Sequence, residues 1–134
     1  MKRYLVVLAS VLLLVAAGCA DGKPTAIRGT VTLDGQPLER GRIEFRPLDE
    51  TGPIAAAEIV DGNYEGLAMA GKKTVVITGG KVVGRRPFTE APGSPMIEDV
   101  QPLVGAEYND NSKLTCDITP IQTQYDFALE SPVR

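Results

Sequence analysis

Two Asp-Gly dipeptides, at residues 34–35 and 61–62, constrain the fold of this chain more than any other feature. Asp-Gly is favoured in two-residue hairpin turns, because both central residues of such a turn need positive φ angles. Residues 27–33, before the first dipeptide, alternate between apolar and polar side chains, and so do residues 42–46 after it. Alternation with a period of two is typical of a strand that is buried on one face. We therefore expect these two segments to form a β-hairpin.

The rest of the chain predicts further short strands. Residues 73–78 form the most β-branched run, which favours a central strand. The 14 Gly and 10 Pro residues suit many short elements joined by turns. No helical periodicity appears after residue 25, which argues against parallel βαβ folds. We predict an all-β fold, specifically a seven-stranded antiparallel β-sandwich. The expected strands are residues 27–33, 42–46, 55–60, 63–67, 73–78, 113–119 and 124–129.

The beginning of the chain has the pattern of an export signal. Met1-Lys2-Arg3 is a short positive stretch, and residues 4–17 are apolar or small apart from Tyr4 and Ser10. This run is too short for a transmembrane helix, which needs about 20 apolar residues. A secretory signal needs an apolar stretch of roughly 7–15 residues between a charged start and small residues. We expect residues 1–18 to be a signal-peptide helix that is removed on export.

The end of this segment, LVAAGC at residues 14–19, resembles the lipobox of bacterial lipoproteins. The resemblance implies that Cys19 is acylated with diacylglycerol and becomes the new N-terminus, although Ala16 stands where Leu or Val is commoner. An ordinary secretory signal with an accidental cysteine is the alternative. Two or more acyl chains make attachment to a membrane stable. Residues 19–25, which are polar and rich in helix breakers, would then be a lipidated tether for a domain at residues 26–134.

Cys116 is the only other cysteine. Once Cys19 is acylated, Cys116 has no intramolecular partner, so no disulfide is expected. It alternates with Leu114 and Ile118, which predicts a small core side chain on a strand. A reactive thiol would need an accessible site and a nearby base or cation to lower its pKa, and the chain has no His. We expect Cys116 to be buried and unreactive.

Charge and composition argue against several classes of function. Without Lys2 and Arg3, the chain has 12 basic and 17 acidic side chains, whereas nucleic-acid binding needs a clustered basic surface. We expect no nucleic-acid partner. A chain without His lacks the commonest general base and the commonest metal ligand of enzymes. We interpret the carboxylate pairs at 49–50 and 98–99 as solvated loop charge, and we expect no catalytic residues, no cofactor and no metal.

A family resemblance supports the β-rich prediction. The segment IRGTVTLDGQPL, at residues 27–38, resembles the opening of carboxypeptidase-regulatory-like domains, where a G-x-V strand precedes D-G-x-P-L. The resemblance continues through RIEF at 42–45, DGNY at 61–64 and GKKTVVI at 71–77. Other segments are similar to small lipoproteins of planctomycete bacteria, namely VGRRP at 83–87, YNDNSKLT at 108–115 and YDFAL at 125–129. The resemblance implies a transthyretin-like (prealbumin-type) sandwich, used as a non-enzymatic module on exported proteins.

The function expected from these observations is that of a cell-envelope lipoprotein. The chain would be held to a membrane by the lipid on Cys19, and its β-sandwich would serve as a structural or protein-interaction module with an envelope protein as partner. Ala20 follows Cys19, which on the enterobacterial sorting rule favours the outer membrane, facing the periplasm or the cell surface. The alternative is a carbohydrate or small-molecule binding module that uses residues 79–112.

Residues 79–112 are the candidate binding segment, because a connection this long is either functional or disordered. The segment contains the positive pair Arg85 and Arg86 and the aromatic residues Phe88 and Tyr108, and arginine and aromatic side chains are enriched at binding hot spots. The alternative is a structural crossing, ordered by apolar side chains that pack onto the core: Val100, Leu103 and Val104. The polar stretch NDNS at 109–112 is interpreted as a turn, since it lacks the spacing of a calcium loop.

Overall fold

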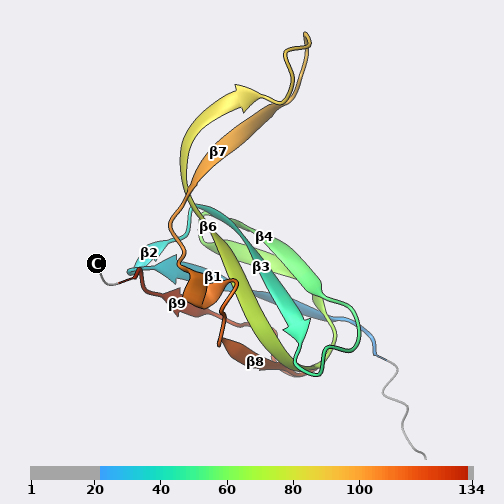
Figure 1. Cartoon of the computed structure of the whole chain (residues 1–134). Coiled ribbons are helices and arrows are strands. Elements are labelled where there is room, and N and C mark those ends of the chain that lie inside the picture. The colour runs from blue at the N-terminus through green and yellow to red at the C-terminus, as the bar shows by residue number, and fades with distance from the viewer. Residues whose placement is uncertain (1–21, 133–134) are drawn as a thin grey trace, which may run out of the picture.

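The computed structural model describes residues 22–132, which form one curled β-sheet with a long hairpin extending from it (Figure 1). The expected signal helix and residues 19–21 of the expected tether, including Cys19, lie outside the described residues. Within residues 22–132, no helix is long and apolar enough to cross a membrane. The prediction of an all-β fold is confirmed, since the only helical element in this part of the chain is a single 3-10 turn, η1 (Ala106–Tyr108).

The sheet has nine strands where the sequence predicted seven. All seven predicted segments have a counterpart, and the two additional strands are β2 and β7. Neighbouring strands follow the order β2-β1-β5-β4-β3-β6-β7, with β8 on β6 and β9 on β1. The strands are β1 (Thr25–Leu33), β2 (Gln36–Pro37), β3 (Arg40–Pro47), β4 (Ala55–Val60), β5 (Asn63–Ala68), β6 (Gly71–Pro87), β7 (Met96–Pro102), β8 (Thr115–Ile118) and β9 (Phe127–Leu129).

Both Asp-Gly dipeptides form the expected turns. Asp34 and Asp61 have φ angles of 51° and 50°, and the glycine after each has a φ of 80°. The second turn joins β4 to β5 as predicted, but the first joins β1 only to the two-residue β2. The predicted hairpin of residues 27–33 with 42–46 is therefore wrong. Pro37 has no N–H to continue the ladder, and β3 pairs instead with β4 and β6.

The last strand closes the sheet next to the first. β9 runs parallel to β1, whose other residues pair antiparallel with β5. Gly29 allows this crowded arrangement, because a Cβ atom at its position would lie 1.8 Å from the carbonyl oxygen of Tyr125. The Thr30 amide also donates a hydrogen bond of 2.8 Å to the Asp126 carboxylate. The glycine of the G-x-V motif therefore serves the close approach of two chain segments.

The curled sheet encloses a single apolar core. Phe45 is fully buried near its centre, with ring centroids 6.0 Å from Tyr64 and 6.3 Å from Phe127. The Tyr64 hydroxyl donates a hydrogen bond to the Tyr125 carbonyl, so this buried polar group is satisfied. The buried hydrophobic residues around them are Ile27, Val31, Leu33, Leu38, Ile43, Ala57, Ile59, Ala68, Val75, Ile77, Val104, Ile118, Tyr125 and Leu129.

Cys116 lies on β8 and packs against this core, as the alternating pattern predicted. It is half-buried rather than fully buried, whereas its neighbour Ile118 is only 1% exposed. Burial raises the pKa of the Cys116 thiol to about 11. At neutral pH the side chain is therefore the protonated thiol, which is a weak nucleophile.

The segment 79–112 is not the irregular connection that the sequence predicted. β6 continues for seven residues beyond Gly80, and β7 pairs antiparallel with it from Pro102 back to Met96. Gly79 and Gly80 look like a strand break in the sequence. In the structure they form a crossing point, because a Cβ atom on Gly79 would lie 2.3 Å from the Arg40 carbonyl oxygen and one on Gly80 would lie 1.7 Å from the Gln101 carbonyl oxygen.

Truncating Ile118 should destabilise the fold strongly. Ile118→Ala removes a fully buried side chain from β8, and we expect the free energy of unfolding to fall by about 2–5 kcal/mol, as large-to-small core changes do. Urea denaturation followed by circular dichroism measures this change. The matched control is the exposed Thr115→Ala on the same strand, which should cost at most about 1 kcal/mol. Equal effects of the two substitutions would contradict the core assignment.

Candidate functional site

The most distinctive surface of the molecule is the extended part of β6 with β7, which we call the ribbon (residues 81–101). It projects from one end of the curled sheet as two strands with no third strand on either side in the described chain (Figure 1). Its end is a β-turn in which Ser94 donates to the Ala91 carbonyl at 3.1 Å and Gly93 has a φ of 79°. Pro92 and Gly93 are the two central residues of this turn, where Pro is favoured at the first position and Gly is favoured at a second position with positive φ.

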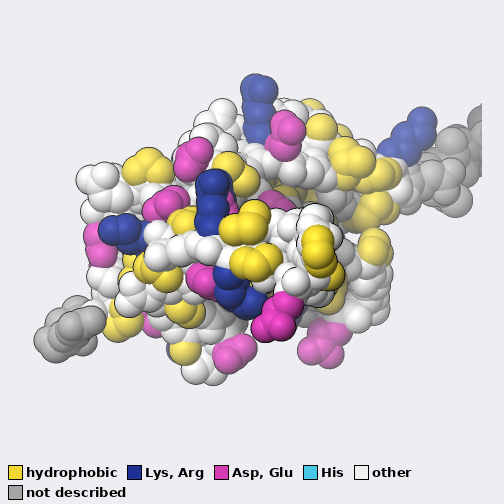
Figure 2. Space-filling view, turned by 90° about the horizontal axis from the view of Figure 1, so that it is seen from above, with side chains coloured by type: hydrophobic (Ala, Val, Ile, Leu, Met, Phe, Trp, Pro, Cys, Tyr) yellow, Lys and Arg dark blue, Asp and Glu magenta, His cyan; other side chains and the backbone are white. Residues whose placement is uncertain are grey.

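Large apolar side chains are exposed along the ribbon. Phe88 is 64% exposed, Met96 61% and Val83 60%. Seen from the ribbon end, hydrophobic side chains gather along it with charged side chains between and around them (Figure 2). Val83 lies at a β-bulge, where the register between the two strands shifts. An accumulation of exposed apolar residues on a projecting element is typical of an interaction surface.

Arg85 and Arg86 are on the ribbon, but they do not form the free positive patch that the sequence suggested. Each is paired across the strands with a carboxylate of β7: Arg85 Nη2 lies 3.1 Å from Glu98, and Arg86 Nε lies 2.8 Å from Asp99. Glu98 and Asp99, interpreted from the sequence as solvated loop charge, are thus strand residues. The ribbon surface at these positions is electrically balanced.

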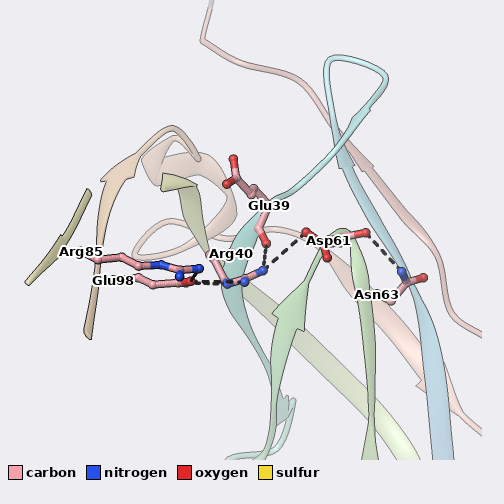
Figure 3. A network of polar contacts seen from close by, with 6 residues as sticks. All are labelled: Glu39, Arg40, Asp61, Asn63, Arg85 and Glu98. Carbon is pink, nitrogen blue, oxygen red and sulfur yellow. Dashed lines mark hydrogen bonds and ion pairs between the residues drawn. The ribbon is translucent and has the colours of Figure 1, made fainter. Parts of the chain in front are cut away.

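Glu98 also connects the ribbon to the body of the protein. Arg40, the first residue of β3, donates through Nε to Glu98 at 2.6 Å and through Nη1 to the Glu39 carbonyl at 2.9 Å (Figure 3). The same guanidinium lies 3.5 Å from Asp61, in the turn between β4 and β5. One carboxylate with two arginines therefore ties the base of the ribbon to β3, and Arg40 extends the network to a second turn.

The contacts of this network shift the pKa values of Glu98 and Arg40. The hydrogen bond from Arg40, assisted by the charges of Arg40 and Arg85, lowers the pKa of the Glu98 carboxyl below its ordinary range. The hydrogen bond to Glu98 raises the pKa of the Arg40 guanidinium in turn. Both groups are therefore fully charged at neutral pH, where the contact is strongest.

Tyr108, the fourth predicted binding residue, lies apart from the other three. It belongs to η1, packs against the core, and its hydroxyl accepts a hydrogen bond of 3.0 Å from the Glu130 amide. Of the apolar residues proposed to order this segment, Val104 is buried, whereas Val100 and Leu103 are exposed. The structural interpretation of the segment thus holds for residues near η1, and the ribbon remains as its free surface.

The polar stretch after Tyr108 forms a turn, as predicted. The Asp110 amide donates to the Asn109 side-chain oxygen at 2.7 Å, and the Asn109 amide group donates to the Gly105 carbonyl at 3.0 Å. Ser112 donates to the Val75 carbonyl of β6. Within residues 22–132, no group of three or more His, Cys, Asp or Glu side chains is placed to hold a metal ion.

The hollows of the surface lie away from the ribbon. Three of them have volumes of about 590 to 610 Å³, and all are open to solvent. The first lies along β1, β4 and β5 and exposes both polar and apolar atoms, and its one aromatic residue, Tyr64, is buried. Of the two aromatic residues of the carbohydrate-binding hypothesis, Phe88 lines none of these three, whereas Tyr108 lines a separate, smaller hollow of about 450 Å³.

Comparisons with protein-family models, curated protein sequences and solved structures find no match to this chain.

Replacing Glu98 should loosen the ribbon in a pH-dependent way. The pKa of Glu98 is lowered from 4.5 in the folded protein. The stabilisation that its charge gives the ribbon is therefore fully present above about pH 4.5, and it is lost as the pH falls through the folded-state pKa. We expect Glu98→Gln to reduce the hydrogen-exchange protection of ribbon amides at about pH 7, and to lack the further loss that protonation of Glu98 causes in the wild type as the pH is lowered.

The matched control for this substitution is Glu58→Gln, which removes an exposed carboxylate paired with Arg42 on the body. Ribbon protection should be unchanged in the control. If Glu98→Gln keeps the wild-type protection of the ribbon at about pH 7, the Arg40–Glu98 contact does not hold it.

Proposed function

We propose that this chain is a lipid-anchored, non-enzymatic protein-interaction module of the bacterial cell envelope, which contacts a partner protein through its ribbon. Two independent features support the proposal. The first is the sequence around Cys19, with its charged start, apolar run and small residues before the cysteine. The second is the exposed ribbon, which is the observation that favours an interaction over a purely structural role.

The physical case for a partner rests on how the ribbon is built. An isolated two-stranded hairpin is marginally stable in water, and stability usually needs a third strand or a covered apolar face. The ribbon has neither in the described chain, and Phe88 and Met96 are both more than 60% exposed. Unpaired strand edges also accept extended segments of other proteins. A partner protein could cover the apolar side chains or add a strand to an unpaired edge, and either contact would stabilise the ribbon.

The chemistry of the surface gives no support to catalysis. The chain has no His, and two carboxylates of the ribbon, Glu98 and Asp99, are each paired with an arginine. Because the pKa of the Glu98 carboxyl is lowered, Glu98 has little affinity for a proton at neutral pH and is a poor general base. We assign these groups to holding the ribbon in shape.

At the level of fold family, we infer that the curled sheet is a transthyretin-like sandwich of the carboxypeptidase-regulatory-like type. The inference is supported by the seven segments that the alternating sequence pattern predicts as strands, each of which has a counterpart in the sheet, and by the role of Gly29, whose place in G-x-V is explained by its contact with Tyr125. The short β2 and the β6–β7 ribbon would then be additions to that sandwich.

Removing the acylation site should release the protein from the membrane. In cells expressing Cys19→Ala, we expect the chain to move from the detergent-extracted membrane fraction to a soluble or uncleaved form, because the acyl chains are the proposed anchor. Fractionation with immunodetection measures the distribution, and intact-mass analysis of the wild type measures the acylated N-terminus. A wild-type mature N-terminus other than acylated Cys19 would show that the anchor proposal is wrong.

Shortening the apolar side chains of the ribbon should abolish partner contacts without unfolding the protein. Phe88→Ala with Met96→Ala removes two exposed side chains, and exposed substitutions usually change stability by less than about 0.5 kcal/mol. We expect wild-type membranes to give a defined protein crosslink that the double variant loses. Val60→Ala, which shortens an exposed side chain on β4, is the matched control and should keep the crosslink.

Three results would count against the proposal. If the double variant keeps every crosslink, the partner binds elsewhere. If the wild type enriches glycans instead of a protein, the carbohydrate-binding alternative is favoured. If the double variant unfolds, the apolar side chains of the ribbon are structural.

A further inference from the structure

The end of the molecule opposite the ribbon gathers three loops around the start of β1 (Figure 1). The pairing registers place them together: Thr25 pairs with Ala68, Pro47 with Lys73, and Gly71 with Ile118. We call this end of the molecule the tether end. It consists of residues 22–24 and of the loops 48–54, 69–70 and 119–124.

Two loops of the tether end expose large apolar side chains. Ile121 is 94% exposed, the highest value among the large hydrophobic residues of the described chain, and Ile54 and Leu48 are 57% and 52% exposed. They come from two different loops, so a single disordered segment does not account for them. Charged groups of the tether end are of both signs, with Lys23 in residues 22–24 and the acidic pair Asp49 and Glu50 in the loop 48–54.

The tether is short where it leaves this surface. β1 already begins at Thr25, and Gly22 lies so close to Met69 that a Cβ on Gly22 would be 1.9 Å from the Met69 Cε. Cys19 is three residues before Gly22, and a fully extended chain spans at most about 3.3–3.6 Å per residue, or roughly 10 Å here. An anchor on Cys19 would therefore lie within about 10 Å of Gly22, beside the loops.

We propose that the tether end rests on the lipid bilayer, with Ile121, Ile54 and Leu48 in the interfacial region. The inference depends on the proposed acylation of Cys19 and adds the orientation of the domain to it. The headgroup layer on each side of a bilayer is about 5–8 Å thick, and apolar side chains gain free energy when they enter its boundary with the acyl chains. Because the charges of this end are mixed, the contact is apolar and does not require anionic lipid.

This orientation has a direct consequence for the ribbon. The ribbon extends from the other end of the sheet, so a domain that rests on its tether end holds Phe88 and Met96 away from the bilayer that anchors it. The two groups of exposed apolar residues would then have different occupants, lipid at the tether end and protein at the ribbon.

The orientation can be measured with a fluorescent probe on the full-length, acylated protein. In a Cys116→Ala background, an environment-sensitive fluorophore is attached to Ile121→Cys, to Ile54→Cys, or to Thr89→Cys near the end of the ribbon. Each protein is reconstituted into phosphatidylcholine vesicles that contain a lipid with a headgroup-level quencher. Acylation of Cys19 is verified by intact mass, and membrane attachment by flotation.

We expect the probes at 121 and 54 to emit at shorter wavelength and to be quenched several-fold more than the probe at 89, with little change when the salt concentration is raised. If the acylated protein floats with the vesicles but all three probes are equally exposed to water, the bilayer contact is wrong and the anchor stands. If Cys19 carries no acyl group, the proposed function fails, and this inference fails with it.

Discussion

The structure depends on how one long strand satisfies its backbone hydrogen bonds. β6 has 17 residues, whereas strands in globular proteins are usually 3–10 residues long, and buried N–H and C=O groups need partners over its whole length. It finds them in succession: β8 pairs with its first residues, β3 with its middle and β7 with its last. The change from β3 to β7 happens at Gly79 and Gly80, where only residues without a Cβ allow the neighbouring backbones to come so close.

The elements that the sequence predicted correctly are those encoded by local rules. Positive φ at Asp34 and Asp61 follows from the Asp-Gly dipeptides, and the buried alternation of β1 places Ile27, Val31 and Leu33 in the core. Such local rules do not specify which strands pair with each other. The pairing of β1 with β5 rather than β3 depends on where Pro37 ends the ladder and where Leu38 enters the core, which is a property of the whole sheet.

The candidate site was only partly predictable for a similar reason. The sequence identified Arg85, Arg86 and Phe88, but a Gly-Gly pair and a bulge at Val83 disrupted the alternation that would have predicted the extension of β6, with which β7 pairs. A signal was present nonetheless, since two arginines and the acidic pair at residues 98–99 flank a Pro-Gly turn, and opposite charges placed so favour cross-strand pairing. The sequence grouped Tyr108 with the ribbon residues Arg85, Arg86 and Phe88. The hydrogen bond that places it elsewhere joins Tyr108 to Glu130, and a contact between such distant residues leaves no local signal in the sequence.

The two parts of the molecule also differ in what stabilises them. The body is held by a buried apolar core, whose removal from water supplies most of the folding free energy. Beyond Gly80, the ribbon is held by backbone pairing and by exposed ion pairs, and such pairs contribute little to stability in water. The ribbon can therefore adjust its conformation on contact with a partner while the core stays intact, since local opening costs least where few apolar contacts are lost. The Arg40–Glu98 contact limits this freedom to the part of the ribbon beyond it.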